Sequence, residues 1–291
     1  MTTGLWNKDR EYQFFHDALK GKIEPEELFY VSENGHYYAY WPASYKGKKN
    51  PLPGRTLMIR AYTEEYALKI MQHYAEEKGL YAVRRPACRE VGLIPRSSAV
   101  IALCTHPESN PEPEQIKAVV EVKMSISWNW AYKNGNIMCI GDYRKHSGSP
   151  GLLRSDSMLK AIAKGINIRT SGPEAATIPF VVLGNTPVTS RYYNRVDHLR
   201  RAGIIQGFWS LNPEPLDESE KDIKSTPGKG YYRFDSMEEF YGAMDNLLDS
   251  GLTFFSGMRS RKELGEMISM SAKQKGHSRQ ADSFLKLLYS D

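Results

Sequence analysis

The spacing of hydrophobic residues changes along the first half of the chain, and each change predicts a different element. From residue 64 to residue 78, apolar side chains recur at helical spacing, with Thr63 as the expected N-cap and Gly79 as the stop. After Gly79 there are three short apolar or β-branched runs, at residues 80–83, 99–104 and 118–122. Turn residues separate these runs, so we expect one helix followed by three successive strands.

Helical and strand patterns alternate through the second half of the chain. Ser155 is expected to cap a helix over residues 155–166, and residues 178–183 form a fourth apolar strand that ends at Gly184. The apolar face of that helix is expected to consist of Met158, Leu159, Ile162 and Ile166. The further elements expected are a helix at 190–202 between Thr189 and Gly203, a strand at 204–208, a helix capped by Ser236 and Glu239 that ends at Gly251, and a mostly helical tail at 259–291.

This order of elements predicts an α/β fold in which helices flank a central mixed β-sheet. The chain has 291 residues, which is enough for one large core with terminal elaborations. We expect three regions that belong to one compact domain: an N-terminal clasp or scaffold at residues 1–62, a core at 63–213 and a helical region at 214–291.

Composition narrows the class of protein without defining it. Hydrophobic residues make up 41% of the chain, so disorder is disfavoured. The formal net charge of +5 favours polyanionic partners such as nucleic acid. An ordinary basic soluble protein fits these values equally well. The three cysteines, Cys88, Cys104 and Cys139, show no zinc-like spacing, and no stretch resembles a signal peptide or a membrane span. We therefore expect a cytoplasmic protein.

The third predicted strand carries a charged pair, Glu121 and Lys123. Side chains two residues apart on a strand face the same side, so the two groups would emerge together while Val120 and Val122 face the opposite layer. Because an unpartnered buried charge is costly, the pair is expected to line a wet cleft or to bind a metal; an edge-strand salt bridge is the alternative. Glu76 and Lys78 have the same spacing on a helix, where such side chains diverge.

A helix, three strands with Glu-x-Lys on the third, a helix and a strand together resemble the core of the PD-(D/E)XK nucleases, over residues 63–184. The resemblance implies that Glu121 is a Mg²⁺ ligand and that Lys123 orients or helps to deprotonate the attacking water. It further implies cleavage of double-stranded DNA in the manner of a type II restriction endonuclease. A palindromic target would imply a homodimer with one active site for each strand.

The sequence departs from the family pattern at the start of the second strand, where an aspartate is expected and residues 95–100 read Pro-Arg-Ser-Ser-Ala-Val. Glu90 is the preferred substitute as a catalytic acid and metal ligand, with a structural salt bridge as the equal alternative. Asp142 is a second candidate metal ligand, although a turn-capping role suits it somewhat better.

Three segments carry candidate DNA contacts. Arg154 precedes a helix N-terminus that would suit a backbone phosphate, although simple capping explains it equally well. Lys48 and Lys49 belong to a basic and aromatic stretch that could clasp a duplex or form a solvated loop. The loop after the fourth strand offers polar and aromatic side chains for base or sugar contacts: Asn185, Thr186, Thr189, Arg191 and Tyr192.

The resemblance, taken with these residues, implies a Mg²⁺-dependent, sequence-specific type II restriction endonuclease. One rival is a repair or mobile-element nuclease with the same core, which would act on DNA structures instead of a short sequence. The other rival is a nucleic-acid-binding protein without catalysis, which the missing aspartate favours.

Overall fold

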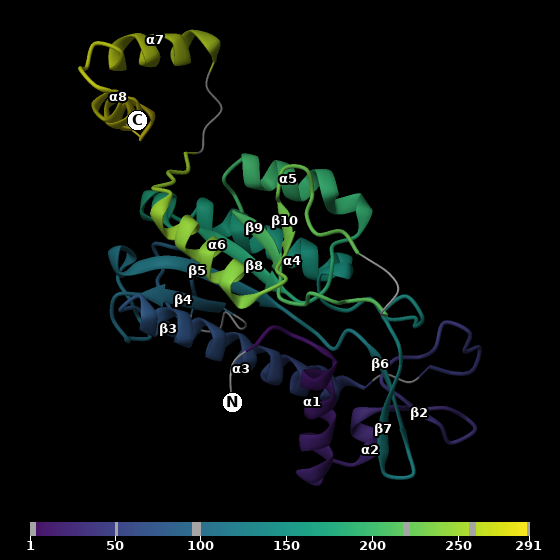
Figure 1. The fold of residues 1–291 in the computed structure, drawn as a ribbon. Coiled ribbons are helices and arrows are strands. Elements are labelled where there is room, and N and C mark those ends of the chain that lie inside the picture. The colour runs from purple at the N-terminus through teal and green to yellow at the C-terminus, as the bar shows by residue number, and fades with distance from the viewer. Residues whose placement is uncertain (1–3, 50–51, 95–99, 218–221, 256–259, 290–291) are drawn as a thin grey trace.

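A six-strand mixed sheet forms the centre of the molecule, and a four-strand antiparallel sheet lies beside it (Figure 1). The structure is a computed structural model, which describes residues 4–49, 52–94, 100–217, 222–255 and 260–289. Within these ranges the chain forms eight α-helices, so the predicted α/β class is confirmed. None of the helices in the described ranges is long and apolar enough to cross a membrane.

The central sheet has the strand order β10-β9-β8-β5-β4-β3. Its strands are β3 (Tyr81–Arg84), β4 (Val100–Cys104), β5 (Ile116–Lys123), β8 (Phe180–Gly184), β9 (Gly207–Ser210) and β10 (Tyr231–Arg233). The first three strands are antiparallel neighbours, and β5, β8, β9 and β10 run parallel. The four predicted strands at residues 80–83, 99–104, 118–122 and 178–183 are therefore confirmed. The strand expected at 204–208 is β9, which begins at Gly207 and ends at Ser210.

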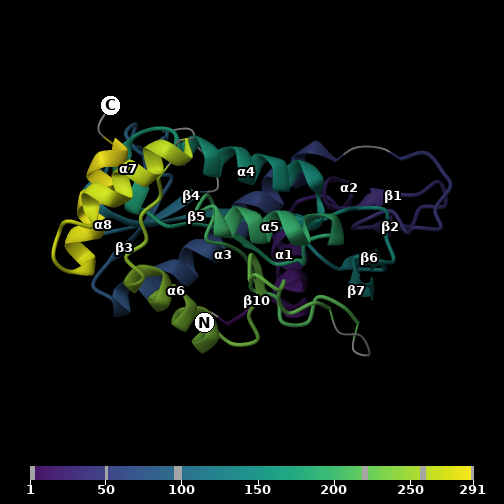
Figure 2. The ribbon, with the colours of Figure 1, turned by 90° about the horizontal axis from the view of Figure 1, so that it is seen from above.

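Helices cover both faces of this sheet (Figures 1 and 2). Helices α3 (Pro53–Glu77) and α6 (Met237–Asp249) pack against one face, in a core that includes Tyr74, Val120 and Met244. Helices α4 (Ser155–Arg169) and α5 (Tyr193–Arg201) cover the other face, in a core that includes Val119 and Met158. The two cores follow from the alternation of β5, because its successive side chains point to opposite layers.

Helix α3 begins well before the residue that the sequence predicts. It starts at Pro53, and Thr63 lies inside the helix with its hydroxyl donating to the Arg60 carbonyl at 3.1 Å. The expected N-cap at Thr63 is therefore wrong. A proline at the first helical position lacks only an N–H that would be unpaired there anyway, so Pro53 opens a helix although its surroundings read as a loop. The helix also spans the division expected between residues 62 and 63.

Helix α4 buries a different face from the predicted stripe. Leu159 and Ile166 are 55% and 45% exposed, while Ala161 and Ile168 are buried with Met158. Arg154, not Ser155, is the N-cap, and the helix continues to Arg169. The sheet therefore covers a face of this helix that includes Met158, Ala161 and Ile168, and part of the predicted apolar stripe faces solvent.

The remaining predicted helices are confirmed with small shifts. A short 3-10 helix, η4 (Ser190–Tyr192), precedes α5, which ends before Gly203 in a left-handed conformation. Ser236 caps α6 by accepting from the Glu239 N–H at 3.1 Å. The tail forms α7 (Arg261–Ser271) and α8 (His277–Tyr289). Further 3-10 helices are η1 (Pro113–Gln115), η2 (Gly151–Leu153) and η3 (Pro173–Thr177).

The N-terminal region and two strands after β5 build the smaller sheet. Its strands are β1 (Tyr30–Val31), β2 (Tyr37–Tyr38), β6 (Asn129–Lys133) and β7 (Asn136–Gly141), beside helices α1 (Lys8–Lys20) and α2 (Pro25–Leu28). Buried Arg55, in the first turns of α3, donates to the carbonyls of Leu28 and Ala39 and so ties the long helix to this region.

A buried carboxylate, Glu11, joins α1 to the segment that follows β5. Its two oxygens accept four hydrogen bonds: from the indole of Trp6 at 2.9 Å, the Ser127 N–H at 2.6 Å, the Trp128 N–H at 3.0 Å and the indole of Trp130 at 3.0 Å. Burial raises the pKa of Glu11 to about 7, against the opposing effect of these donors. Glu11 therefore fixes the path of the chain just after the strand that carries Glu121 and Lys123.

Candidate active site

Glu121 and Lys123 project from the end of β5, in the middle of the central sheet. Glu121 pairs in register with Val100 of β4 and Val182 of β8, and Lys123 pairs with Gly184. Both side chains lie on the α4 face, opposite Val120 and Val122 in the other core. The expected common side of the pair is therefore confirmed.

Two ammonium groups hold the Glu121 carboxylate. Lys123 Nζ donates to Oε1, and Lys164 Nζ, from α4, donates to Oε2 at 2.5 Å. The Glu121 side chain is 2% exposed, against 18% for Lys123 and 20% for Lys164. Burial lowers the pKa of Lys164, and the Glu121 charge opposes that change. Glu121 is therefore buried in a salt bridge with two partly accessible lysines and does not line an open cleft, in contrast to the expectation from the sequence. The salt bridge resembles the alternative given above, except that β5 is a central strand and not an edge strand.

Replacement of Lys164 by methionine is expected to lower the free energy of unfolding by about 1–3 kcal/mol, because it leaves a buried Glu121 oxygen without its charged donor. Chemical denaturation would measure the loss. Lys160→Met, one helical turn away and exposed, is the matched control and should cost less than about 0.5 kcal/mol. The double variant Lys164→Met with Glu121→Gln should recover part of the loss; a strictly additive pair would show that the two groups do not interact.

The N-terminus of α4 lies against the end of β5. A Cβ on Gly151, which has a positive φ of 53°, would come within 3.2 Å of the Lys123 carbonyl oxygen, so η2 approaches the strand closely. Asp156, in the first turn of α4, pairs with Lys160 at 3.0 Å and with Arg154 at 3.7 Å. Lys160 lowers the pKa of Asp156, and Lys123 contributes to the same change. The first turn of α4 and the end of β5 therefore share one electrostatic environment.

Three arginines surround a second buried carboxylate, Glu64 of α3. Arg60 bonds it at 2.8 Å, Arg85 at 2.9 Å and Arg84 at 3.2 Å. The positive charge of Arg60 also contributes to the lowered pKa of Lys164. The arginines around Glu64 are therefore electrostatically linked to the lysines around Glu121.

We call the linked side chains the basic cluster. It consists of the cations Arg60, Lys69, Arg84, Arg85, Lys123, Arg154, Lys160 and Lys164 with the carboxylates Glu64, Glu65, Glu121 and Asp156. The cations outnumber the carboxylates, so the cluster attracts anions and suits a phosphate chain.

The two candidates for the missing acid do not join this cluster. Glu90 is exposed and accepts from the Cys88 thiol at 3.5 Å, in a turn that Asn167 binds through the Gly92 carbonyl at 3.0 Å. Asp142, at the end of β7, accepts from the N–H of Arg144 at 2.8 Å and the N–H of Asp217 at 3.3 Å. This is the turn-capping arrangement given above as the alternative. The stretch at residues 95–99, where the aspartate was expected, lies outside the described residues.

The predicted DNA contacts divide into exposed and buried groups. Lys48, Lys49, Arg154 and Arg191 are exposed, and Thr189 is half-buried. Asn185 is buried and bonds both the N–H and the carbonyl of Ser125, at 3.0 and 2.5 Å. Thr186 is buried and accepts from the Leu152 N–H at 2.8 Å, and Tyr192 is 3% exposed. In this structure Asn185, Thr186 and Tyr192 therefore support the loops and do not face solvent.

Among the described residues at the end of β5, Glu121 is the carboxylate that could serve as a protein ligand for Mg²⁺. No three His, Cys, Asp or Glu side chains among the described residues come together as a metal-binding group, so Glu90, Glu121 and Asp142 do not form one. Mg²⁺ commonly binds through one or two carboxylates and completes its shell with water and substrate phosphate oxygens. Glu121 is the carboxylate that could supply such a ligand, and because Lys123 and Lys164 occupy both of its oxygens, a bound Mg²⁺ would have to displace one of these ammonium groups.

Sequence reasoning missed Lys164 and Glu64. Lys164 lies two helical turns from Asp156, on the same side of α4 as Lys160, and this spacing was the available signal. Glu64 is buried whereas its neighbour Glu65 is exposed. Nothing in the sequence around these two glutamates indicates which of them the fold would bury.

Comparisons with known proteins give no further identification. No protein-family model matches the chain, and neither the curated proteins nor the solved structures give a significant match.

Proposed function

We propose that the chain is a Mg²⁺-dependent DNA endonuclease with a PD-(D/E)XK core, acting as a type II restriction endonuclease. The observation that carries the proposal is the position of Glu121 and Lys123 on the same side of β5. β5 is the third strand in the order α3, β3, β4, β5, α4, β8, which resembles the order of the family core, with β6 and β7 of the smaller sheet inserted between β5 and α4.

The surroundings of the pair support chemistry on a phosphodiester. The basic cluster would bind the DNA backbone without reading bases, and the amides in the first turn of α4 add donors for a phosphate oxygen. Glu121 would hold Mg²⁺, which when bound supplies positive charge that lowers the pKa of an attacking water. Lys123 would orient that water and stabilise negative charge on the phosphate. Lys164 would help to neutralise the same negative charge.

The substrate in this proposal is double-stranded DNA with a short recognition sequence. The exposed side chains of Lys48, Lys49, Arg154 and Arg191 would contact the duplex. A palindromic sequence would be read by a homodimer, because its two-fold symmetry matches that of two identical chains.

Incubation of the purified protein with long DNA, in Mg²⁺ and in chelator, tests the proposal directly. We expect discrete fragments with a common end sequence in Mg²⁺ and intact DNA in chelator. Cleavage confined to junctions or flaps would favour the repair or mobile-element nuclease instead. Intact DNA under all divalent cations, with the wild-type protein folded, would contradict a nuclease.

One observation favours a second candidate function, DNA binding without cleavage. Both Glu121 oxygens accept from lysines, so the carboxylate already has partners without a metal. In that case wild-type protein would shift DNA in a salt-dependent binding assay, and Glu121→Gln would change neither binding nor DNA integrity.

A further inference from the structure

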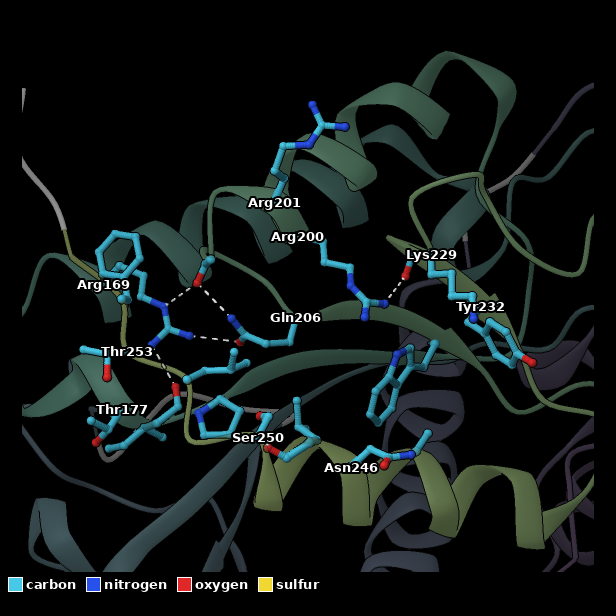
Figure 3. Close-up of a pocket in the computed structure, with 18 of the residues that line it drawn as sticks. Arg169, Thr177, Arg200, Arg201, Gln206, Lys229, Tyr232, Asn246, Ser250 and Thr253 are labelled. Atoms are coloured by element: carbon cyan, nitrogen blue, oxygen red, sulfur yellow. Dashed lines mark hydrogen bonds between the residues drawn. The ribbon is translucent and has the colours of Figure 1, made fainter. Parts of the chain in front are cut away.

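A cavity of about 720 Å³ lies at the opposite end of β8 from Glu121 and Lys123 (Figure 3). Pro179 and Gln206, just before β8 and β9, line it together with the last turn of α5 and one side of α6. In contrast, Lys123 is paired with Gly184 at the far end of β8. The cavity volume falls within the roughly 300–1,000 Å³ typical of small-molecule sites.

Arg169, in the wall of this cavity, is a buried cation without a counter-ion among the described residues. It is 5% exposed, and its guanidinium donates only to neutral oxygens: the carbonyls of Gly203, Ala175 and Ile178 and the side-chain oxygen of Gln206, at 2.6–3.0 Å. Burial lowers the pKa of Arg169 to about 10, and no carboxylate opposes that effect. The guanidinium also lies over the Phe254 ring, 5.4 Å from its centroid, so Arg169 is held by the protein itself. Because no carboxylate cancels its charge, Arg169 makes the cavity more favourable for an anion without itself binding one.

Arg200 and Lys229 add two more cations at another part of the rim. Arg200 Nη1 donates to the Lys229 carbonyl at 2.7 Å, which fixes the guanidinium at the cavity wall, as Figure 3 shows. The Arg201 side chain points away from them in the same view. Glu239, the carboxylate among the lining residues, accepts from Lys224 at 3.0 Å and from Tyr232 at 2.5 Å, so its charge is already neutralised.

The rest of the lining suits a flat organic group with polar edges. Trp209, Phe234 and Leu247 supply aromatic and aliphatic surface. Asn246 of α6 and Ser250, which caps the C-terminus of that helix, lie on the opposite wall and carry amide and hydroxyl groups (Figure 3). Apolar walls, a few polar groups and cations at the rim are typical of sites for phosphorylated aromatic ligands.

We propose that this cavity binds a mononucleotide, with its phosphate at Arg200 and Lys229 and its base against the apolar wall that includes Trp209. A bare phosphate would fill little of the cavity, whereas a nucleoside monophosphate has both the negative charge and the aromatic body that the lining accommodates. This inference does not depend on the proposed nuclease activity, because no residue of the basic cluster lines the cavity.

Titration calorimetry of the full chain with adenosine monophosphate, adenosine and inorganic phosphate tests the inference. We expect adenosine monophosphate to bind at least tenfold more tightly than either fragment. Arg200→Ala and Lys229→Ala should each weaken its binding about tenfold or more, since each removes a charged phosphate donor. Arg195→Ala, on the same helix but outside the cavity, and Lys160→Ala, in the basic cluster, are charge-matched controls and should leave the affinity unchanged.

Three results would overturn the proposal. Adenosine or inorganic phosphate that binds as tightly as the nucleotide would show that the cavity does not require both parts. Nucleotide binding that Lys160→Ala weakens and Arg200→Ala leaves intact would place the ligand at the basic cluster. No binding of adenosine monophosphate to the folded wild-type protein would contradict the proposal outright.

Discussion

Glu121→Gln is expected to reduce DNA cleavage by roughly a thousandfold or more, which corresponds to about 4 kcal/mol of lost transition-state stabilisation. Glutamine keeps the shape of the side chain but removes the negative charge that would hold a divalent cation. Lys123→Ala should have an effect of the same kind, because it removes the group beside the attacking water. The measurement is the single-turnover rate of plasmid cleavage at saturating protein.

Binding of the same DNA should survive both substitutions, since Glu121 and Lys123 would act on metal and water and not on base edges. Glu76→Gln is the matched control, because Glu76 is an exposed glutamate with a lysine two residues on but lies on α3. Full cleavage by Glu121→Gln would refute the assignment of the active site. Thermal denaturation of each variant separates a chemical defect from misfolding, because Glu121 is buried.

Glu11→Ala is expected to destabilise the fold by roughly 4 kcal/mol or more at pH 5. Four buried N–H donors lose their acceptor, and each unsatisfied donor costs on the order of 1–3 kcal/mol. The change also disconnects α1 from the chain after β5, so activity should decline with stability. Urea denaturation followed by circular dichroism would measure the free energy of unfolding.

The cost of Glu11→Ala should depend on pH. The folded-state pKa of Glu11 is about 7, above its ordinary value of 4.5, so the folded state holds this proton more tightly than the unfolded state does. The stabilising contribution is therefore complete below pH 4.5 and is lost as the pH rises through 7. At roughly 1.4 kcal/mol per pKa unit, the difference between wild type and variant should shrink by about 3 kcal/mol over this window.

Asp9→Ala is the control for Glu11→Ala, because Asp9 is exposed on the same helix. It should cost less than about 1 kcal/mol, and that cost should not change between pH 5 and pH 8. An equal loss for Glu11→Ala at both pH values would show that burial does not alter its ionisation.

Strands and helix ends with strong local signals were predictable from the sequence, and long-range packing was not. Apolar runs located β3, β4, β5 and β8, and glycines located the ends of α5 and α6. The start of α3 was missed because prolines read as loop residues. The face of α4 was misjudged because the width of the sheet, which is set by strands distant in sequence, decides which positions are covered.

The candidate site was predictable only where neighbouring positions on one strand define it. Alternation along β5 placed Glu121 with Lys123, whereas Lys164 comes from a helix more than forty residues later. Asn185 and Thr186 looked like surface recognition residues because polar side chains usually favour water. The fold instead uses them to satisfy the backbone of adjoining loops, as buried polar groups require.

The long helix α3 connects parts of the molecule that the sequence keeps far apart. Arg55 anchors its first turns to the N-terminal region, Glu64 pairs with three of the four arginines of the basic cluster, and Tyr74 near its end bonds Asp245 of α6 at 2.8 Å. With 25 residues at about 1.5 Å each, it is a stiff rod roughly 37 Å long. Because the helix is stiff, a displacement of the smaller sheet would be transmitted along it to the middle of the molecule and on to α6.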